Sequence, residues 1–369
     1  MSVRAAVVGL GWAGRELWLP RLASHPDFEL VAVADPDPAA RAAVGAATGT
    51  PAHATPDALD AGSVDLAVVA VPNHLHTTVA AGLLRRGVSV FLEKPVCLSS
   101  AEADVLAAAE RDGGGTLLAG SAARHRADVH ELAGLVPGLG RIRHADLAWV
   151  RARGVPRAGG WFTRRSEAGG GALVDLGWHL VDTLTALLGP SPVRQAVGAT
   201  SDDFLNTGEW SAAWRREQPV TAPTGDVEDT ARGLLLREDG ISVSLHASWA
   251  SHEARDLTLV RVEGSAGTAE LRCTFGFSPN RQPESVLTLT REGTTRRLPV
   301  PAEPVGAEYA RQLDGVPALL ADPAGRGRAI AEARTTVRLV ERLYASARAD
   351  RDGAERARVP ADHEQMRTP

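Results

Sequence analysis

The sequence predicts an α/β protein of two domains, a doubly wound parallel sheet followed by an α/β domain with a mainly antiparallel sheet. Three observations favour this class. The chain has 369 residues, more than one ordinary core requires. Short apolar segments alternate with amphipathic segments up to residue 120, as in βαβ units. Beyond residue 121, strand-like segments separated by turn residues dominate.

Residues 1–120 are expected to form the first domain. Its segments between helices are too uniformly apolar to have one face in water, which is typical of a parallel sheet covered on both sides. We predict strands over 4–8, 29–34, 65–70, 89–92 and 116–119, and alanine- and leucine-rich helices over 37–48, 75–86 and 99–112.

Residues 121–348 are expected to form the second domain. Turn signals such as Glu238-Asp239-Gly240 separate its strands. We predict helices over 128–136, 172–188, 307–320 and 327–347, the last two closing the sheet, and strands over 141–150, 231–237, 241–248, 257–263, 268–272, 285–290 and 294–300. The weakly patterned segment 201–226 is expected to be a long loop over the site or at a subunit contact. The polar tail 349–369 has a composition that permits disorder.

The composition excludes several classes of function. Apolar residues make up 44% and charged residues 23% of the chain, and the net charge is −5, which favours neither nucleic acid nor membrane as a partner. No segment reaches about 18 uninterrupted apolar residues. Cys97 and Cys273 stand far apart, so neither a disulfide framework nor a zinc site is predicted. We therefore expect a cytoplasmic protein without a metal.

One residue stands out by its type. Lys94 is the single lysine, whereas the other 39 basic residues are arginines. Arginine replaces lysine readily on a surface, but a guanidinium stays protonated and cannot act as a compact ammonium in proton transfer. Lys94 is therefore a candidate functional residue, although one lysine can also persist by chance.

A glycine-rich turn points to a dinucleotide. Gly9, Gly11 and Gly14, with Trp12 and Ala13 between them, form Gly-x-Gly-x-x-Gly between a predicted strand and a helix. Such a turn lets the backbone approach a pyrophosphate. Asp35 follows the next strand, where a carboxylate accepts hydrogen bonds from both adenine-ribose hydroxyls and repels a 2′-phosphate. NAD is therefore favoured, while Arg41 leaves NADP possible.

Two further strand ends carry polar side chains on the same sheet edge. Pro72, Asn73 and His76 follow one strand, although Asn73 is also suited to capping a helix and His76 to an ordinary surface role. Glu93 and Lys94 end the next strand, before a proline that restricts the lysine backbone and whose peptide bond we expect to be cis. Ligands bind at this edge of open α/β sheets.

In the second domain, a run of glycines from Gly169 to Gly171 leads into a helix. Asp175 and His179 stand four residues apart on it and thus share one face. Such a pair can hold hydroxyl groups and move protons. Two alternatives are a pair that only stabilises a helix surface, and a metal pair with Asp182 as third ligand.

Together these motifs resemble the Gfo/Idh/MocA oxidoreductase family, in order and over most of the chain. The resemblance implies a Rossmann domain followed by a domain with a large open sheet, whose exposed face commonly forms homodimers or homotetramers. It assigns catalytic roles to Lys94, Asp175 and His179, with Lys94 stabilising the reacting oxygen and His179 as acid or base. Cofactor contacts are expected at Gly9, Gly11, Trp12, Ala13, Gly14, Asp35, Pro72, Asn73, His76, Glu93 and Lys94.

The resemblance also extends substrate contacts to Arg124 and Trp161, besides Lys94, Asp175 and His179. Trp161 is equally suited to packing alone. Trp178 departs from the family pattern, and it is expected either to narrow the pocket or to pack beneath it. Trp210, Trp214, Arg215 and Arg216 lie in the 201–226 loop and are not part of that pattern.

The expected function is transfer of a hydride between NAD(P) and a secondary hydroxyl or ketone of a sugar, amino sugar or cyclitol. The alternatives are an enzyme that retains NAD and oxidises its substrate transiently, as in a glycosidase or epimerase, and a non-enzymatic NAD-binding sensor. An intact set of Lys94, Asp175 and His179 favours the enzyme.

Overall fold

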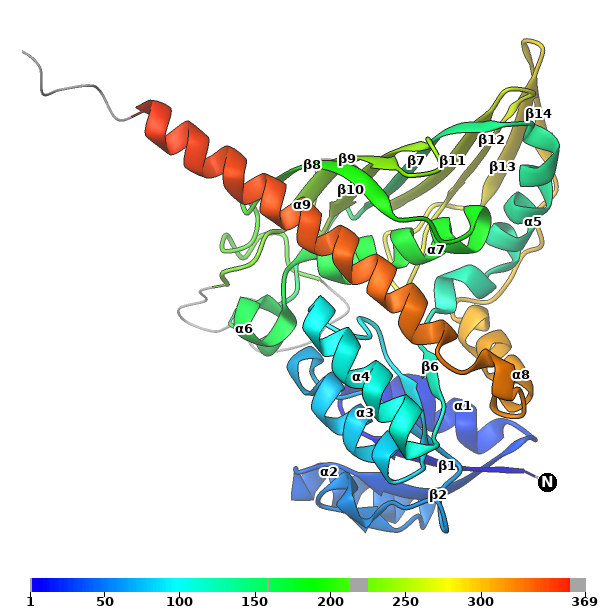
Figure 1. Cartoon of the computed structure of the whole chain (residues 1–369), viewed down its shortest axis with the longest axis vertical. Helices are drawn as coiled ribbons and strands as arrows, with labels where there is room; N and C mark the ends of the chain where they lie inside the picture. The colour runs from blue at the N-terminus through cyan, green and yellow to red at the C-terminus, as the bar shows by residue number, and fades with distance from the viewer. Residues whose placement is uncertain (1, 158, 213–224, 359–369) are drawn as a thin grey trace, which may run out of the picture.

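The chain folds around two sheets, one from each half of the sequence. The computed structural model describes residues 2–157, 159–212 and 225–358, with side chains described as far as residue 350. In Figure 1 the N-terminal part and the large C-terminal sheet form separate layers, and the long helix near the C-terminus runs past both. The predicted fold class is confirmed.

The first sheet is six-stranded and parallel, with strand order β3-β2-β1-β4-β5-β6. This is the doubly wound order, in which the chain reverses its winding direction between β1 and β4 and leaves a crevice at the strand ends. The strands are β1 (Val3–Val8), β2 (Phe28–Ala34), β3 (Ala52–His53), β4 (Leu66–Val69), β5 (Ser89–Leu92) and β6 (Leu117–Ala119). Only β3 was not predicted, because two residues carry no pattern.

Helices connect and cover these strands. Asp37 and Ser99 cap the helices that follow them, accepting hydrogen bonds from Ala39 N (2.9 Å) and Glu102 N (3.1 Å). The helices are α1 (Leu19–Ser24), α2 (Pro38–Thr48), α3 (His76–Arg85) and α4 (Ser100–Gly113). All four residues of β4 are buried, as the apolar strand pattern predicts.

The second sheet has eight strands in the order β14-β13-β12-β11-β7-β10-β9-β8. Its neighbouring strands are antiparallel except β7 and β10. They are β7 (Ile142–Val150), β8 (Val193–Ser201), β9 (Thr230–Arg237), β10 (Ser242–Ser248), β11 (Leu257–Gly264), β12 (Thr268–Cys273), β13 (Val286–Arg291) and β14 (Thr294–Leu298). The edge strand β8 was missed, because its burial does not alternate regularly.

One face of this sheet is covered by helices. The elements are α5 (Ala127–Leu135), the short α6 (Arg165–Ala168) and α7 (Trp178–Leu188), which a wide π-helical turn from Leu173 to Gly177 precedes. Leu180 of α7 shares a buried cluster with Val260 and Val262 of β11. Val197 and Leu234 are exposed apolar residues on β8 and β9.

The last two helices correct one prediction. Leu313 of α8 (Ala307–Leu320) packs into the core of the first sheet, and so does Ile330 of α9 (Arg328–Arg358). Only the later part of α9, with Leu343, joins the second core. The two helices therefore tie the layers together rather than closing the second sheet alone, and α9 spans both in Figure 1.

The segment beyond residue 349 is helical as far as Arg358, whereas residues 359–369 lie outside the described part of the chain. Charged residues recur along α9, which distinguishes it from an apolar spanning helix. Within the described ranges no helix combines the length and the hydropathy that crossing a membrane requires.

Candidate active site

The glycine turn at the end of β1 has the close packing that its motif predicts. Gly9 adopts a φ of +94°, and a Cβ there would lie 2.6 Å from Ala70 O, so only glycine fits. A Cβ on Gly14 would collide with Gly9 O, whereas one on Gly11 would meet open space. Gly11 therefore leaves its backbone accessible, as a pyrophosphate requires.

Asp35 fixes this turn from the end of β2. Its Oδ2 accepts a hydrogen bond from Leu10 N at 2.6 Å and its Oδ1 one from Asp37 N at 2.8 Å. A carboxylate offers about four lone-pair positions, so both oxygens can still accept ribose hydroxyls. Arg41 Nη1 donates to the Asp35 and Pro36 carbonyls at 2.6 and 2.9 Å. The residues present thus fit an NAD-type cofactor.

Trp12 and Ala13 occupy the middle of the motif. Ala13 begins a wide helical turn that ends at Trp18. The Trp12 ring is half exposed and meets the edge of Phe277 from the second domain, with ring centroids 5.4 Å apart. The glycine turn is therefore bounded on one side by the second domain.

The residues after β4 hold the main chain around the site. Asn73 is buried and its Nδ2 donates to Ala168 O at 3.0 Å, while Pro72 precedes the short turn Asn73–Leu75. The buried ring of His76 lies between Pro95 O (2.7 Å) and Val71 O (2.9 Å), and burial lowers its pKa to about 4. Because both ring nitrogens face main-chain carbonyls, this geometry gives His76 a supporting position, and a direct cofactor contact stays a prediction.

Glu93 and Lys94 lie at the end of β5. The Lys94-Pro95 peptide bond is cis, as expected. Glu93 Oε1 accepts a hydrogen bond from Trp18 Nε1 at 2.8 Å, and Oε2 accepts one from Lys94 N at 3.0 Å. Burial raises the pKa of Glu93. The carboxyl group thereby fixes the main chain from which the lysine side chain extends.

Lys94 and Asp175 meet across the two domains. Lys94 Nζ lies 2.6 Å from Asp175 Oδ1, and Trp249 Nε1 donates to Asp175 Oδ2 at 2.9 Å. Burial alone would raise the pKa of Asp175, but the charges of Lys94 and Arg151 and these hydrogen bonds outweigh it and hold the pKa below its usual value. Asp175 is thus a fixed anion beside the ammonium.

His179 completes this group, which we name the inner site (Lys94, Asp175 and His179). It is buried, and its ring packs against Trp149 with centroids 5.4 Å apart. Burial and the nearby cations of Lys94 and Arg151 lower its pKa to about 3. The imidazole is therefore neutral at ordinary pH, with one ring nitrogen unprotonated.

The π-helical turn that carries Asp175 has an anchor that the sequence did not reveal. Glu228 Oε1 accepts hydrogen bonds from Gly171 N (2.9 Å) and Leu173 N (3.1 Å), and from Tyr344 Oη at 2.7 Å. Glu228 follows a weakly patterned segment, so no spacing links it to the glycines. Trp249 directly follows β10, and its indole contacts Asp175.

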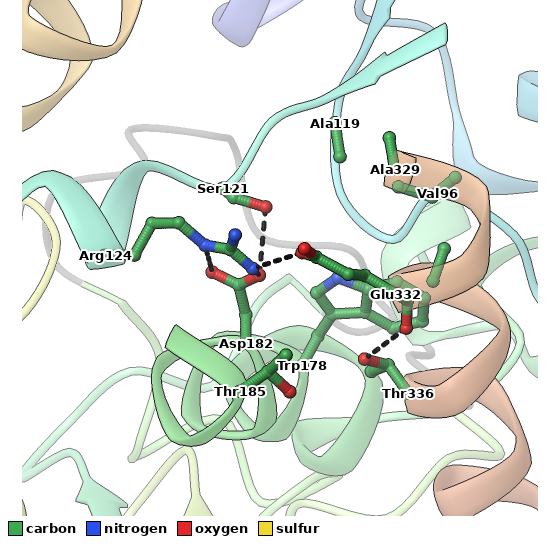
Figure 2. A pocket seen from close by; sticks show the side chains of 11 residues that line it. Val96, Ala119, Ser121, Arg124, Trp178, Asp182, Thr185, Ala329, Glu332 and Thr336 are labelled. Carbon is green, nitrogen blue, oxygen red and sulfur yellow. Dashed lines mark hydrogen bonds and ion pairs between the residues drawn. The ribbon is translucent and has the colours of Figure 1, made fainter. Parts of the chain in front are cut away.

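Arg124 does not join the inner site in this structure. Its guanidinium forms ion pairs with Asp182 and with Glu332 of α9, and Ser121 Oγ donates to Asp182 at 3.0 Å. Figure 2 shows these side chains converging beside Trp178, which is buried and packs with the core of the first domain. The substrate contact of Arg124 stays a prediction, because both its partners are carboxylates of the protein.

The contacts of Asp182 concern the alternative in which Asp175, His179 and Asp182 bind a metal. The carboxylate of Asp182 is bound by Arg124 Nε at 3.1 Å and by Ser121. Within the part of the chain that the structure describes, no three His, Cys, Asp or Glu side chains group as metal ligands.

Trp161 lies on an aromatic path that leads away from Asp175. Its ring centroid is 4.8 Å from that of Phe162, which in turn is 6.1 Å from that of Trp249. In the 201–226 loop, Trp210 packs against Phe204 and His252, whereas Trp214, Arg215 and Arg216 fall outside the described residues. A substrate contact of Trp161 stays a prediction.

Known proteins match over most of the chain. The family model described as "Oxidoreductase family, NAD-binding Rossmann fold" matches residues 3–121, and the GFO/IDH/MocA C-terminal domain matches residues 138–270. A relative from Amycolatopsis mediterranei, named as a candidate UDP-kanosamine synthase oxidoreductase subunit, is 67% identical over 98% of this chain and 99% of its own length.

Two less similar proteins also match along nearly the full length of the chain. A Streptomyces antibioticus protein named dTDP-3,4-didehydro-2,6-dideoxy-alpha-D-glucose 3-reductase is 27% identical over 94% of this chain and 97% of its own length. The crystal structure of GenD2 from gentamicin A biosynthesis, in complex with NAD, has a TM-score of 0.74 and 26% identity, covering 95% of each chain. The chain therefore belongs to the Gfo/Idh/MocA family of NAD(P)-dependent oxidoreductases.

Proposed function

We propose that this protein oxidises a secondary hydroxyl of a nucleotide-linked sugar to a ketone with NAD, or catalyses the reverse reduction. The observation that carries the proposal is the contact of 2.6 Å between Lys94 Nζ and Asp175 Oδ1, with His179 one helical turn beyond the aspartate. This cluster lies at the carboxyl edge of the parallel sheet, as the glycine turn does. Ligands bind at that edge.

When bound, NAD accepts the hydride that leaves the carbinol carbon. The chain then has to take the hydroxyl proton and stabilise the charge that develops on oxygen. Neutral His179 accepts the proton, and the Lys94 ammonium donates a hydrogen bond to the same oxygen. Asp175 orients Lys94 and accepts a neighbouring substrate hydroxyl. In reduction the same groups return a proton to the ketone.

Asp35 favours NAD over NADP. Its two oxygens lie at the glycine turn, where a 2′-phosphate would face a carboxylate. Arg41 is held by the Asp35 and Pro36 carbonyls, so its guanidinium is engaged by main-chain oxygens. We infer that NADP binds more weakly than NAD.

The name of the 67% identical relative supports the substrate class. Synthesis of a UDP-linked amino sugar requires replacement of a hydroxyl by an amine, and the part that an oxidoreductase contributes is oxidation of that hydroxyl to a ketone. We infer that this chain acts on a UDP-hexose and that a separate amine-transferring partner consumes the ketone. A free sugar or a cyclitol is the alternative substrate.

The exposed face of the large sheet is the expected contact of a homodimer or homotetramer. Val197 on the edge strand β8 and Leu234 on the neighbouring β9 expose 66% and 54% of their surfaces. Exposed apolar residues on a sheet face favour burial against a second copy.

The test is a titration of the protein with NAD and NADP, followed by absorbance of NADH with UDP-glucose, UDP-galactose, glucose and an inositol. The proposal expects tighter binding of NAD and NADH formation with a UDP-hexose. Binding without net NADH formation, together with loss of a glycosidic bond, would support the enzyme that retains its cofactor. Binding without any conversion would support the sensor.

A further inference from the structure

One aromatic and cationic cluster lies outside the residues that the proposed reaction uses. The ring of Trp210 contacts those of Phe204 and His252, with centroids 4.6 and 5.1 Å away. The guanidinium carbon of Arg153 lies 4.3 Å from the Trp210 ring centroid. We name these four residues (Arg153, Phe204, Trp210 and His252) the outer cluster.

A short stretch of chain connects the outer cluster to the inner site. Trp149 lies near the end of β7 and contacts the ring of His179, and Nη1 of Arg151, the residue after this strand, lies 3.9 Å from Asp175 Oδ2. Arg153 is two residues further on, and two residues of extended chain span at most about 7 Å. The outer cluster therefore begins a short distance beyond the residues that contact Asp175 and His179.

A second strand end confirms this proximity. Arg153 pairs through an isolated bridge with Ala250, the residue after Trp249, and Trp249 Nε1 donates to Asp175. Val155 N further donates to Trp210 O at 3.0 Å, which ties the loop that carries Trp210 to the same stretch of chain. Both connections hold the outer cluster next to the inner site.

Among the described residues, Arg153 has no acidic partner, whereas other charged residues near the inner site have one. Its side chain is exposed, and no carboxylate among residues 2–157, 159–212 and 225–350 forms an ion pair with it. Arg124, in contrast, is paired with two carboxylates. A guanidinium that is supported by a ring but lacks an acidic partner suits an anionic ligand, and its planar fork matches a phosphate.

The rings of the outer cluster suit the planar part of such a ligand. Indole and imidazole rings stack on nucleobases, and a stack of this kind contributes about 1–3 kcal/mol per base in nucleic-acid complexes. A free sugar offers neither a phosphate for Arg153 nor a base for Trp210. A nucleotide-linked sugar offers both, separated from its reacting hydroxyl by the sugar ring.

We propose that the outer cluster binds the nucleoside diphosphate part of a nucleotide-activated sugar. Arg153 binds the diphosphate, and Trp210 and His252 pack against the base, while the sugar ring extends to Lys94 and His179. This inference rests on the proposed function, because the sugar has to end at the inner site. It assigns substrate selection to residues that take no part in proton transfer.

The direct test is calorimetric titration of the NAD-loaded protein with UDP. Arg153→Gln removes the charge, Trp210→Leu removes the indole, and Arg143→Gln is the matched control, an exposed arginine near the start of β7, the strand that precedes Arg153. We expect the Kd of UDP to rise at least tenfold in each of the first two variants and to stay within twofold in the control. Unchanged Kd in Arg153→Gln and Trp210→Leu, or no UDP binding to the unaltered protein, would overturn the proposal.

Steady-state kinetics separates this proposal from the proposed function. In Arg153→Gln we expect the ratio of kcat/KM for a UDP-hexose to that for the unlinked hexose to fall at least tenfold, mainly through KM. Arg153→Lys should recover part of the loss, because it keeps the charge without the planar fork. An unaltered protein that oxidises free and UDP-linked hexoses equally well would refute this inference while leaving the proposed reaction intact. Full turnover by Lys94→Ala would refute the reaction itself.

Discussion

The inner site and the outer cluster differ in how their charges are balanced. In the inner site the partly buried Lys94 is paired with the buried Asp175 at 2.6 Å. In the outer cluster Arg153 is exposed and has no carboxylate partner among the described residues. Fixed charges suit a reaction that is the same for every substrate, and an unbalanced cation suits the part of the ligand that distinguishes one substrate from another. We therefore assign proton transfer and charge stabilisation to the inner site, and substrate selection to the outer cluster.

The largest effect is expected at His179. His179→Asn keeps a polar side chain but removes the proton acceptor, so kcat should fall about 10²–10⁴-fold. Binding of NAD and of UDP should change little, because neither contact uses the imidazole. Single-turnover measurement of NADH formation checks this expectation, and a loss confined to KM would contradict it.

The next effect concerns the choice of cofactor. Asp35→Ser removes the carboxylate that faces the adenine ribose, so repulsion of a 2′-phosphate disappears. Juxtaposed like charges cost several kcal/mol, and we expect the NADP to NAD ratio of kcat/KM to rise at least about tenfold. An unaltered ratio would show that Asp35 serves only the glycine turn, where it binds Leu10 N.

A smaller effect is expected at Trp249. Trp249→Phe removes the hydrogen bond to Asp175 Oδ2 while keeping an aromatic ring in the core. A hydrogen bond to a charged group contributes about 1.5–3 kcal/mol, so kcat should fall about tenfold or more. Since a merely structural role would lower Tm without this loss, both quantities are measured on the same variant.

The smallest effect is on the pH dependence of stability. The pKa of His179 is lowered to about 3 in the folded protein, below its usual value of about 6.5 when unfolded. Between these pH values the unfolded chain binds a proton that the folded chain refuses, so folding weakens as pH falls below about 6.5. In His179→Asn the slope of unfolding free energy between pH 5 and 6 should decrease by about 1.4 kcal/mol per pH unit. An equal slope in both proteins would mean that the histidine is protonated in the native state.

Much of the first domain could be predicted because its signals are local. The glycine turn, Asp35 and Lys94 each lie at the end of a strand, and parallel strands bring their carboxyl ends to one edge. The two-residue strand β3 has too few residues to show a pattern. In the second domain, β8 was missed because its burial does not alternate, and α8 and α9 return to the first sheet through contacts that sequence spacing does not encode.

In the candidate site, too, local spacing could be predicted from the sequence, whereas contacts between distant segments could not. The spacing of Asp175 and His179 placed them on one helical face, but the partners of Asp175 come from distant segments. Trp249, which contacts Asp175, is 74 residues beyond it, and Glu228, which anchors the turn that carries Asp175, is 53 residues beyond it, so only the fold brings these residues together. Arg124 resembled a substrate contact by position, whereas in the fold Asp182 and Glu332 bind it.

The measurement that tests the central claim most directly compares turnover and NAD binding in Lys94→Ala. The account predicts that NADH formation from a UDP-hexose falls at least about 10³-fold, because the ammonium that stabilises the oxygen is lost, while the Kd of NAD changes less than about threefold. Lys94→Arg should also be impaired, since a guanidinium does not replace the compact ammonium. Turnover that persists in Lys94→Ala would contradict the account, because the reaction would then not depend on the ion pair that joins the two domains.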